Sequence, residues 1–396
     1  MGGSRDFKPV DKDVPASTAH IGLNALLLSL SADYRGAGAN SYIYHLLRHL
    51  DKMDGQYHYT AFLSDRRFAT GGRMALYFAR WPAYGPVARI MWEQIVQPVI
   101  LRQKRIDLVH GLAFVTPLLS PCPTVVTIFD LSFLRFPESF RQANRTYLRL
   151  FTSLSARRAR RVIAISEHTK RDVVHLLGIP AEKVEVIYCG VETNFYPRPV
   201  AEVQAFRQQR GLPERFVLFV GTLEPRKNVR RLIEAYAQIR NLGVKLVIVG
   251  GKGWLYDDIF ASVERLGLSD EVLFAGYVPA EELPFWYNAA KLFVFPSLYE
   301  GFGLPPLEAM ACGTPVISSD AASLPEVVGE AGLMVAPQDV DGLAEAMRQV
   351  LGDQGLREQL RERGLQQARQ FSWEKIAQQT ITVYQQVLDT RGTERV

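Results

Sequence analysis

The chain has 396 residues, of which 47% are hydrophobic and 22% are charged, and its formal net charge is +5. This length predicts two domains rather than one core, and the composition is that of a globular protein rather than a disordered or fibrous one. No apolar run approaches the roughly 20 residues that a membrane span needs, which argues against a membrane-spanning protein.

Residues 1–19 contain no apolar core of a secretion signal, and we expect them to form a disordered leader. The three cysteines, Cys122, Cys189 and Cys312, are scattered without the spacing of metal ligands. Reduced thiols in a cytoplasmic protein are therefore expected.

Charge is distributed unevenly along the chain. Residues 1–195 contain 25 Lys and Arg against 16 Asp and Glu, a net charge of +9. Residues 196–396 contain the remaining 21 Lys and Arg against 25 Asp and Glu, a net charge of −4. A basic half of this kind is typical of a surface that contacts anionic lipid, or of a site for a phosphorylated substrate. A solvated, arginine-rich face is the alternative interpretation.

Short apolar runs alternate with amphipathic stretches from residue 20 onward. In the first half, strands are predicted at 20–30, 58–63, 106–110, 124–129, 161–165 and 184–191. Helices are predicted at 40–53, 86–104, 141–158 and 167–178. Pro197 and Pro199 then interrupt the pattern, which predicts a domain boundary after residue 195.

The series restarts beyond these prolines. Strands are predicted at 215–223, 245–251, 272–278, 291–297, 315–319 and 332–337, with a helix at 228–240 and further helical patterns between the strands. The last pattern is an amphipathic helix at 372–388, with no strand after it.

Continuous Val, Ile and Leu runs that alternate with helices indicate parallel sheets covered on both faces. We therefore predict an α/β protein with two Rossmann-like, doubly wound domains, residues 20–195 and 196–371, which face one cleft. Ligands of such sheets bind at the carboxyl ends of the strands.

A basic pair follows the first strand of the second predicted domain, in the stretch GTLEPRKN. Gly221 permits a sharp turn, and Asn228 is predicted to cap the helix that begins there. Arg226 and Lys227 beside a helix N-terminus are typical of an anion site. Ordinary solvated charges at the start of a helix are the alternative interpretation.

A second Gly-rich turn, GAGAN at 36–40, follows the first strand of the chain. Its central Gly38 suits the close approach of a phosphate. The turn matches neither G-x-G-x-x-G nor a Walker motif, and such turns also serve strand–helix packing alone.

The stretch YEGFGLPPLEAMACGTPVISSD places Glu300 and Glu308 eight positions apart. Glu300 falls in the loop at the carboxyl end of a strand, and Glu308 falls on the first or second turn of a helix that begins near Pro305 or Pro306. A carboxylate accepts two hydrogen bonds and so matches the vicinal diols of sugars and riboses. The pair is predicted to hold two sugars of one ligand, with the helix N-terminus near the phosphates between them. For Glu308, a favourable first-turn charge is the alternative.

Several motifs jointly resemble one known family. E-x7-E at Glu300 and Glu308, GTLEPRKN, ISEHTKRDVV at 165–174 and SLPEVVGEAG at 323–332 are similar to the retaining GT-B glycosyltransferases of family 4. The resemblance covers residues 20–390. TLEPRKN and TIFDLSFLRFPE most resemble the mannosyltransferase-like branch of polysaccharide and O-antigen assembly.

The resemblance implies a role for each site residue. Arg226 and Lys227 would bind the donor diphosphate, Glu308 the nucleotide ribose and Glu300 the hydroxyls of the donor sugar. The implied catalytic residues are Glu300, Arg226, Lys227 and Asp130. The other implied donor-binding residues are Gly38, Gly221, Thr222, Val278, Gly301, Phe302, Gly303 and Leu304. The last helix would cross back onto the first domain, which sets residues 372–396 apart as a separate segment.

One position departs from the family pattern. Relatives usually carry His-Asp at the end of the strand that here reads TVVTIFDLSF, and Phe129 stands in place of that histidine, before Asp130. In relatives the histidine lies near the donor sugar and contributes to transfer. Asp130 and His110, which ends the preceding strand, are the predicted acceptor residues, and a structural histidine is the alternative for His110.

The departing diphosphate would develop negative charge, which Arg226, Lys227 and helix N-termini are predicted to stabilise without a metal. The D-x-D at Asp11 to Asp13 falls in the leader, a poor place for a metal site, so neither a metal nor another cofactor is predicted. The resemblance implies front-face transfer, in which the leaving phosphate helps to deprotonate the acceptor hydroxyl.

The expected donor is a nucleotide-diphosphate sugar, with GDP-mannose first and a UDP-sugar second, and the expected acceptor is a glycan or a lipid-linked sugar. The expected location is the cytoplasm, with peripheral contact at an anionic inner membrane face and no nucleic-acid partner. A nucleotide-sugar epimerase, a phosphorylase and a non-catalytic sugar-nucleotide-binding subunit are the alternatives, whereas the missing dinucleotide fingerprint disfavours a dehydrogenase.

Overall fold

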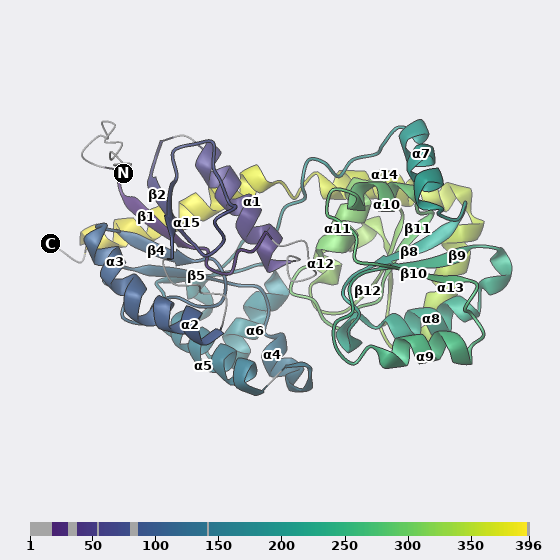
Figure 1. Ribbon diagram of the computed structural model, residues 1–396, viewed down its shortest axis with the longest axis horizontal. Coiled ribbons are helices and arrows are strands. Elements are labelled where there is room, and N and C mark those ends of the chain that lie inside the picture. The colour runs from purple at the N-terminus through teal and green to yellow at the C-terminus, as the bar shows by residue number, and fades with distance from the viewer. Residues whose placement is uncertain (1–17, 31–37, 54, 80–85, 141, 394–396) are drawn as a thin grey trace, which may run out of the picture.

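The computed structural model of the protein describes residues 18–30, 38–53, 55–79, 86–140 and 142–393 (Figure 1). These residues form two α/β domains, each built around one parallel sheet with helices on both faces. The predicted fold class is therefore confirmed. The predicted leader falls almost entirely outside the described residues.

The first sheet has seven parallel strands in the order β3-β2-β1-β4-β5-β6-β7. The strands are β1 (His20–Asn24), β2 (His58–Leu63), β3 (Ala75–Phe78), β4 (Leu108–Gly111), β5 (Thr124–Ile128), β6 (Arg161–Ala164) and β7 (Val184–Val186). The strand order reverses between β1 and β4, and sheets of this class bind ligands at the carboxyl ends of the strands on either side of such a reversal. The strand predicted at 20–30 ends at Asn24, and β3 was not predicted.

Between residues 38 and 183, the described α-helices of the first domain are α1 (Ala39–Lys52), α2 (Pro86–Met91), α3 (Gln97–Gln103), α4 (Ser132–Arg135), α5 (Gln142–Arg158) and α6 (Glu167–Leu177). The helix predicted at 86–104 is interrupted by a π-helical turn, η2 (Trp92–Val96). Helix α6 begins where the hydroxyl of Ser166 accepts the backbone N–H of Thr169 at 3.0 Å, and ends at Gly178 in the left-handed conformation.

The second sheet has six parallel strands in the order β10-β9-β8-β11-β12-β13. The strands are β8 (Phe216–Val220), β9 (Lys245–Val249), β10 (Val272–Gly276), β11 (Leu292–Phe295), β12 (Val316–Ser319) and β13 (Leu333–Val335). Every residue of β8, FVLFV, is buried, as expected for a central strand covered on both faces. Here the order reverses between β8 and β11.

The helices of the second domain are α7 (Val200–Arg210), α8 (Val229–Ala237), α9 (Asp257–Arg265), α10 (Leu283–Ala289), α11 (Leu304–Ala311), α12 (Leu324–Val328), α13 (Val340–Gly352) and α14 (Gln354–Ala368). Helix α7 was not predicted. It starts directly after Pro199 and packs against α10, where Phe206 stacks on Phe285.

The last helix, α15 (Trp373–Thr393), returns to the first domain and lies along α1 (Figure 1). The hydroxyl of its Tyr384 lies 2.7 Å from Nδ1 of His110 in β4. The two segments that connect the domains run side by side, because the N–H of Val191 donates to the carbonyl of Phe371 at 3.1 Å.

Candidate active site

The predicted basic pair and Glu300 meet at the point where the second sheet reverses its strand order. Arg226 and Lys227 lie in a single 3-10 turn after β8, and Glu300 lies in the loop after β11. Nη1 of Arg226 donates to Oε2 of Glu300 at 2.8 Å, and Nζ of Lys227 donates to Oε1 at 2.7 Å. Since β8 and β11 are neighbours, their loops leave the sheet together and bring these three side chains into one cluster.

Arg226 has two further partners in the second domain. Its Nη2 donates to Oε1 of Glu224 at 2.6 Å, and its Nη1 also donates to the carbonyl oxygen of Tyr299 at 2.6 Å. Burial alone would lower the pKa of the Arg226 guanidinium, but the charges of Glu300, Glu224 and Asp130 outweigh it and raise that pKa. Arg226 is therefore a fixed cation.

Glu300 is a buried but ionised carboxylate. Burial opposes its charge, yet the charges of Arg226 and Lys227, together with their hydrogen bonds, lower the pKa of Glu300 to about 2. Both cations of the predicted anion site are thus already paired with a carboxylate. An anionic ligand would share these cations with Glu300 or displace it.

Asn228 does not cap α8 as predicted. It adopts the left-handed conformation with φ of 60°, and its side chain makes no capping hydrogen bond. Its Nδ2 instead donates to the carbonyls of Pro296 at 2.9 Å and Pro337 at 2.6 Å. The side chain therefore ties together the loops that follow β8, β11 and β13.

The loop 299–303 is held from α12 by one hydroxyl. Oγ of Ser323 lies 2.9 Å from the carbonyl of Glu300 and 2.7 Å from that of Phe302. Gly303 has φ of 128°, a conformation that favours glycine, and α11 starts after it at Leu304, one residue earlier than predicted. The backbone beside Glu300 is therefore rigidly placed.

Glu308 lies on α11, where the hydroxyl of Tyr287 donates to its Oε2 at 2.8 Å. Burial raises the pKa of Glu308 to about 7, the hydrogen bond from Tyr287 opposes this shift, and the charge of Glu192 adds to it. The carboxyl is therefore poised to change its charge near neutral pH.

The remaining predicted donor residues lie at the carboxyl edges of the two sheets. The carbonyl of Gly221, which precedes Thr222, would be 1.9 Å from a Cβ on Gly250, so the loops after β8 and β9 pack backbone against backbone. Val278 follows β10 and is buried in the core. Gly38 precedes α1 with φ of 66°, and Gly36 of the same turn lies outside the described residues.

On the first domain, Asp130 follows β5. Its Oδ1 accepts the N–H of Ser132 at 2.8 Å and the hydroxyl of Ser132 at 2.5 Å, and its charge acts on Arg226 across the domain boundary. The neighbouring Phe129 is a core residue, with its ring edge-on to Tyr42 at 5.0 Å and to Phe114 at 5.5 Å.

His110 does not have the geometry of an acceptor residue. It is completely buried, its Nδ1 lies 2.7 Å from the hydroxyl of Tyr384, and its Nε2 lies 2.8 Å from that of Thr127. Burial lowers the pKa of His110 to about 3, so the ring is neutral. The structure supports the alternative interpretation, a structural histidine between β4 and α15.

A D-x-D besides that of the leader occurs at Asp339 and Asp341. Asp339 caps α13 by accepting the N–H of Gly342 at 2.8 Å, and Asp341 accepts Nε2 of Gln238 at 2.7 Å. In the part of the chain that the structure describes, no group of three or more His, Cys, Asp or Glu side chains is arranged to hold a metal ion.

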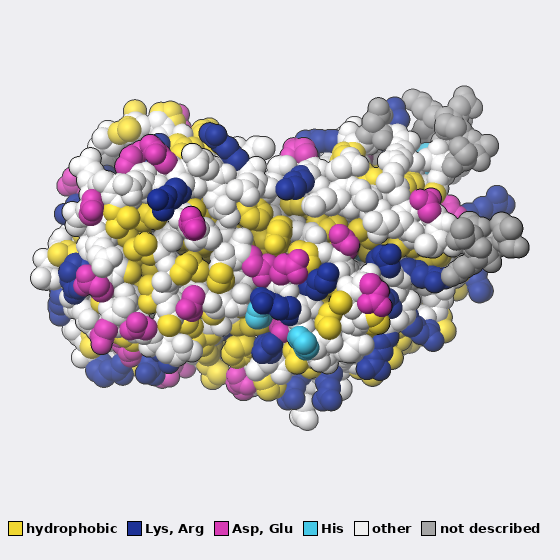
Figure 2. Space-filling model, turned by 180° about the vertical axis from the view of Figure 1, so that it is seen from behind, with side chains coloured by type: hydrophobic (Ala, Val, Ile, Leu, Met, Phe, Trp, Pro, Cys, Tyr) yellow, Lys and Arg dark blue, Asp and Glu magenta, His cyan; other side chains and the backbone are white. Residues whose placement is uncertain are grey.

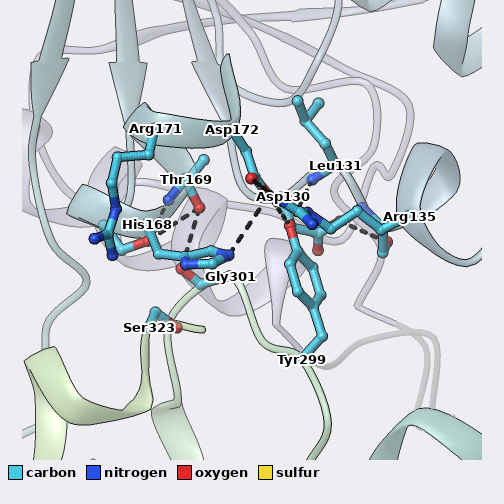
Figure 3. A network of polar contacts seen from close by, with 12 residues as sticks. Asp130, Leu131, Arg135, His168, Thr169, Arg171, Asp172, Tyr299, Gly301 and Ser323 are labelled. Carbon is cyan, nitrogen blue, oxygen red and sulfur yellow. Dashed lines mark hydrogen bonds and ion pairs between the residues drawn. The ribbon is translucent and has the colours of Figure 1, made fainter. Parts of the chain in front are cut away.

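A polar contact between the domains lies beside this cluster and was not predicted (Figure 3). The hydroxyl of Tyr299, from the second domain, donates to Oδ2 of Asp172 in α6 at 2.8 Å. Glu326 of α12 accepts the backbone N–H groups of Glu167 and His168, both at 2.7 Å. The motifs ISEHTKRDVV and SLPEVVGEAG, which carried the family resemblance, therefore meet at this contact.

Two parallel-sheet domains with ligand loops at their facing carboxyl edges are the GT-B architecture of glycosyltransferases. Residues 202–367 match the family described as glycosyl transferases group 1, and residues 36–195 match glycosyltransferase family 4. O-antigen chain mannosyltransferase B of Escherichia coli is 36% identical over 81% of this chain and 85% of its own length. The chain belongs to glycosyltransferase family 4.

Other relatives extend this comparison. Serotype-specific mannosyltransferase WbdA of Escherichia coli is 33% identical over 59% of this chain, which spans 29% of that longer protein. Among solved structures, sucrose-phosphate synthase from Thermosynechococcus elongatus has a TM-score of 0.75 at 26% identity, and covers 94% of this chain and 100% of its own. The Anabaena protein HepE, solved with UDP and glucose, has a TM-score of 0.72 at 24% identity and shares the fold. The match covers 93% of this chain and 99% of the HepE chain.

Proposed function

We propose that the protein is a retaining hexosyltransferase that moves mannose from GDP-mannose to a glycan or lipid-linked acceptor in polysaccharide or O-antigen assembly. The observation that carries the proposal is the cluster of Arg226, Lys227 and Glu300 at the switch point of the second sheet. The mannosyltransferase relatives support mannose as the sugar. A UDP-sugar is the second candidate donor.

In this proposal, Arg226 and Lys227 stabilise the charge that develops on the departing diphosphate, so no metal is required. Glu300 accepts hydroxyls of the donor sugar, and Glu308 accepts those of the ribose. Gly221, Thr222, Val278 and the backbone of 301–304 line the donor site. The acceptor hydroxyl approaches from the side of Asp130 and loses its proton to the leaving phosphate on the same face.

The test is a product analysis with GDP-mannose, UDP-glucose and UDP-GlcNAc, each with and without EDTA. We expect hexose transfer from GDP-mannose to persist in the presence of EDTA. NMR of the product should show the same anomeric configuration as in the donor. An isomerised donor would identify an epimerase. Phosphate-dependent release of a sugar phosphate would identify a phosphorylase, and binding without turnover would identify a non-catalytic subunit.

Glu300→Gln should lower turnover by about tenfold, because the amide cannot accept two sugar hydroxyls as the carboxylate does. Affinity for free GDP should hold or rise, because the variant no longer competes for Arg226 and Lys227. Steady-state rates and calorimetry measure the two quantities. Equal losses of turnover and GDP affinity would contradict the assignment of Glu300 to the sugar.

Glu308→Gln should weaken GDP-mannose binding at pH 8 and at the same time stabilise the ligand-free protein. Since the pKa of Glu308 is raised from its ordinary 4.5 to about 7, the folded protein holds an extra proton between these values, and stability falls as the pH rises through this window. The glutamine variant lacks this penalty. It should be more stable than the unmodified protein by about 1–3 kcal/mol at pH 8.

Urea denaturation at pH 5 and pH 8 measures this difference in unfolding free energy. The gain should be small at pH 5 and full at pH 8. The same difference at both pH values would show that the carboxyl does not titrate near 7, and unchanged donor affinity would remove Glu308 from the ribose site.

We also propose that the first domain contacts an anionic membrane surface, where a lipid-linked acceptor would be found. Met91, Ile95 and Val99 are exposed by 49%, 56% and 53%, and their spacing of four places them along one face of the helical stretch from α2 to α3. The stretch packs beside α5, where the guanidinium of Arg89 lies 5.7 Å from the ring centre of Tyr147. No helix among the described residues is long and apolar enough to cross a membrane.

The helices that carry Met91, Ile95 and Val99, and the adjacent α5, are strongly basic. Residues 86–106 and 142–161 contain ten Lys and Arg and one acidic residue, Glu93, which is buried. On the face shown in Figure 2, Lys and Arg side chains gather along the lower edge of the first domain, the right half of the view. Basic helices that also expose apolar side chains complement an anionic, lipid-covered surface.

Binding to vesicles that contain phosphatidylglycerol should be measurable at low salt and should fall steeply as salt rises, because each basic residue near the surface contributes about 1 kcal/mol within a Debye length. Changing Arg157, Arg158, Arg160 and Arg161 to Gln should weaken it. Arg157, Arg158 and Arg160 are exposed, whereas Arg161 is partly buried. A melting curve must therefore accompany this variant.

Ile95→Ser is the second variant, because it removes an exposed apolar side chain and leaves every charge in place. It should also weaken vesicle binding, with an unchanged melting temperature. Sedimentation with the vesicles measures both effects. No binding at low salt would leave a soluble glycan as the acceptor.

A further inference from the structure

Tyr299 belongs to the second domain, but its side chain is buried against the first (Figure 3). We propose that Tyr299 is a positioning residue that makes the geometry of the donor site depend on contact between the two domains. The inference rests on the proposed function, since it deepens the account of the same site.

The hydroxyl of Tyr299 bridges two elements of the first domain. It donates to Oδ2 of Asp172 in α6 at 2.8 Å and accepts the backbone N–H of Leu131 at 3.2 Å. Leu131 directly follows Asp130, whose charge reaches Arg226. The hydroxyl therefore fixes the second domain against the segment that carries Asp130.

The backbone of Tyr299 contacts the donor side of the site. Its carbonyl oxygen accepts Nη1 of Arg226 at 2.6 Å, and the same nitrogen donates to Glu300, the next residue. A displacement of the Tyr299 ring therefore moves an acceptor of the residue proposed to hold the diphosphate, and moves the residue proposed to hold the sugar.

In the first domain, Asp172, which accepts this hydroxyl, is also paired with Arg135. Nε of Arg135 donates to Oδ2 of Asp172 at 2.9 Å, and its Nη2 pairs with Oδ1. Burial would raise the pKa of Asp172, but the hydrogen bonds from Arg135 and Tyr299 lower it, so the group is ionised. If the domains separate, Asp172 keeps Arg135 as its partner. The contact can therefore open without leaving a buried, unpaired charge.

Three aromatic or cationic groups of the first domain surround the ring of Tyr299. The rings of Phe136 and His168 lie 5.6 and 5.5 Å from its centre, and the guanidinium of Arg135 lies 5.9 Å away. A phenylalanine would retain these contacts. Tyr299→Phe consequently isolates the hydroxyl that makes the two polar bonds.

Tyr299→Phe should lower kcat by about tenfold, the factor for loss of one to two hydrogen bonds, and should leave the affinity for free GDP within about twofold. Amide hydrogen exchange in residues 129–136 should become about tenfold faster, because the N–H of Leu131 loses its acceptor. Exchange measured by mass spectrometry does not depend on any activity.

Tyr236→Phe is the matched control, because it removes a buried hydroxyl that donates to the carbonyl of Val244 at 2.7 Å, within the second domain. It should lower the melting temperature and change neither kcat nor exchange in 129–136. An unchanged kcat in Tyr299→Phe, or an equal fall in kcat and GDP affinity, would overturn the inference. If the unmodified protein transfers no hexose, the proposed function fails, and unchanged exchange in 129–136 would then overturn the inference separately.

Discussion

Replacing Arg226 with alanine should lower the rate of hexose transfer by roughly 10²–10³, the scale of losing one preorganised donor that stabilises transition-state charge. Arg226 is suited to this role because its guanidinium is held on three sides, by Glu224, Glu300 and the carbonyl of Tyr299. Its charge is therefore already in place when the diphosphate departs. Initial rates at saturating GDP-mannose measure the effect.

The variant also leaves Glu224, which is 3% exposed, without its cation, so the melting temperature must be followed. Arg226→Lys retains a charge but not the planar fork, and should fall between the alanine variant and the unmodified protein. Arg230→Ala is the matched control, because this arginine is on the adjacent helix with 56% of its side chain exposed. A loss below tenfold in a folded Arg226→Ala protein would remove the residue from the leaving-group site.

Gly301→Ala should lower transfer by roughly 10², because a Cβ at this position cannot coexist with the observed contact between the domains. The added atom would lie 2.1 Å from the carbonyl oxygen of Phe129 and 3.1 Å from Cβ of Asp130. Both residues directly follow β5, and Phe129 is buried in the core. The domains would therefore have to separate, while GDP binding to the second domain should persist.

Gly352→Ala provides the control, since a Cβ at that position meets no atom within 4 Å. It should leave both transfer and GDP binding unchanged. Calorimetry and transfer rates of the two variants are compared at the same temperature. Full transfer by Gly301→Ala would show that the reaction does not use this arrangement of the domains.

Most of the fold follows from local patterns. The buried strands of both sheets were predicted, because continuous apolar runs such as FVLFV that alternate with helical patterns are typical of a parallel sheet covered on both faces. Strand β3 was missed because it is a four-residue edge strand with none of its residues buried. Helix α7 was missed because the prolines before it were interpreted only as a domain boundary, although proline is also common at the start of a helix.

The residues of the candidate site also divide into those that local patterns predicted and those that they did not. Arg226, Lys227 and Glu300 were predicted because each follows a strand, and adjacent strands bring their carboxyl-end loops together. Tyr299, Asp172 and Glu326 were missed because their partners lie in the other domain, and spacing along the chain does not show how domains meet. His110 was assigned to the acceptor because its partner Tyr384 comes 274 residues later.

The return of α15 to the first domain affects the order in which the protein can be completed during synthesis. Domains generally fold as units, with the N-terminal one first. Here, however, Tyr384 supplies the buried partner of His110, and Trp373 packs against Gly190 and the ring of Tyr42. These side chains leave the ribosome only after the entire second domain. The first domain is therefore synthesised first, but its core is completed only after the second domain has been synthesised.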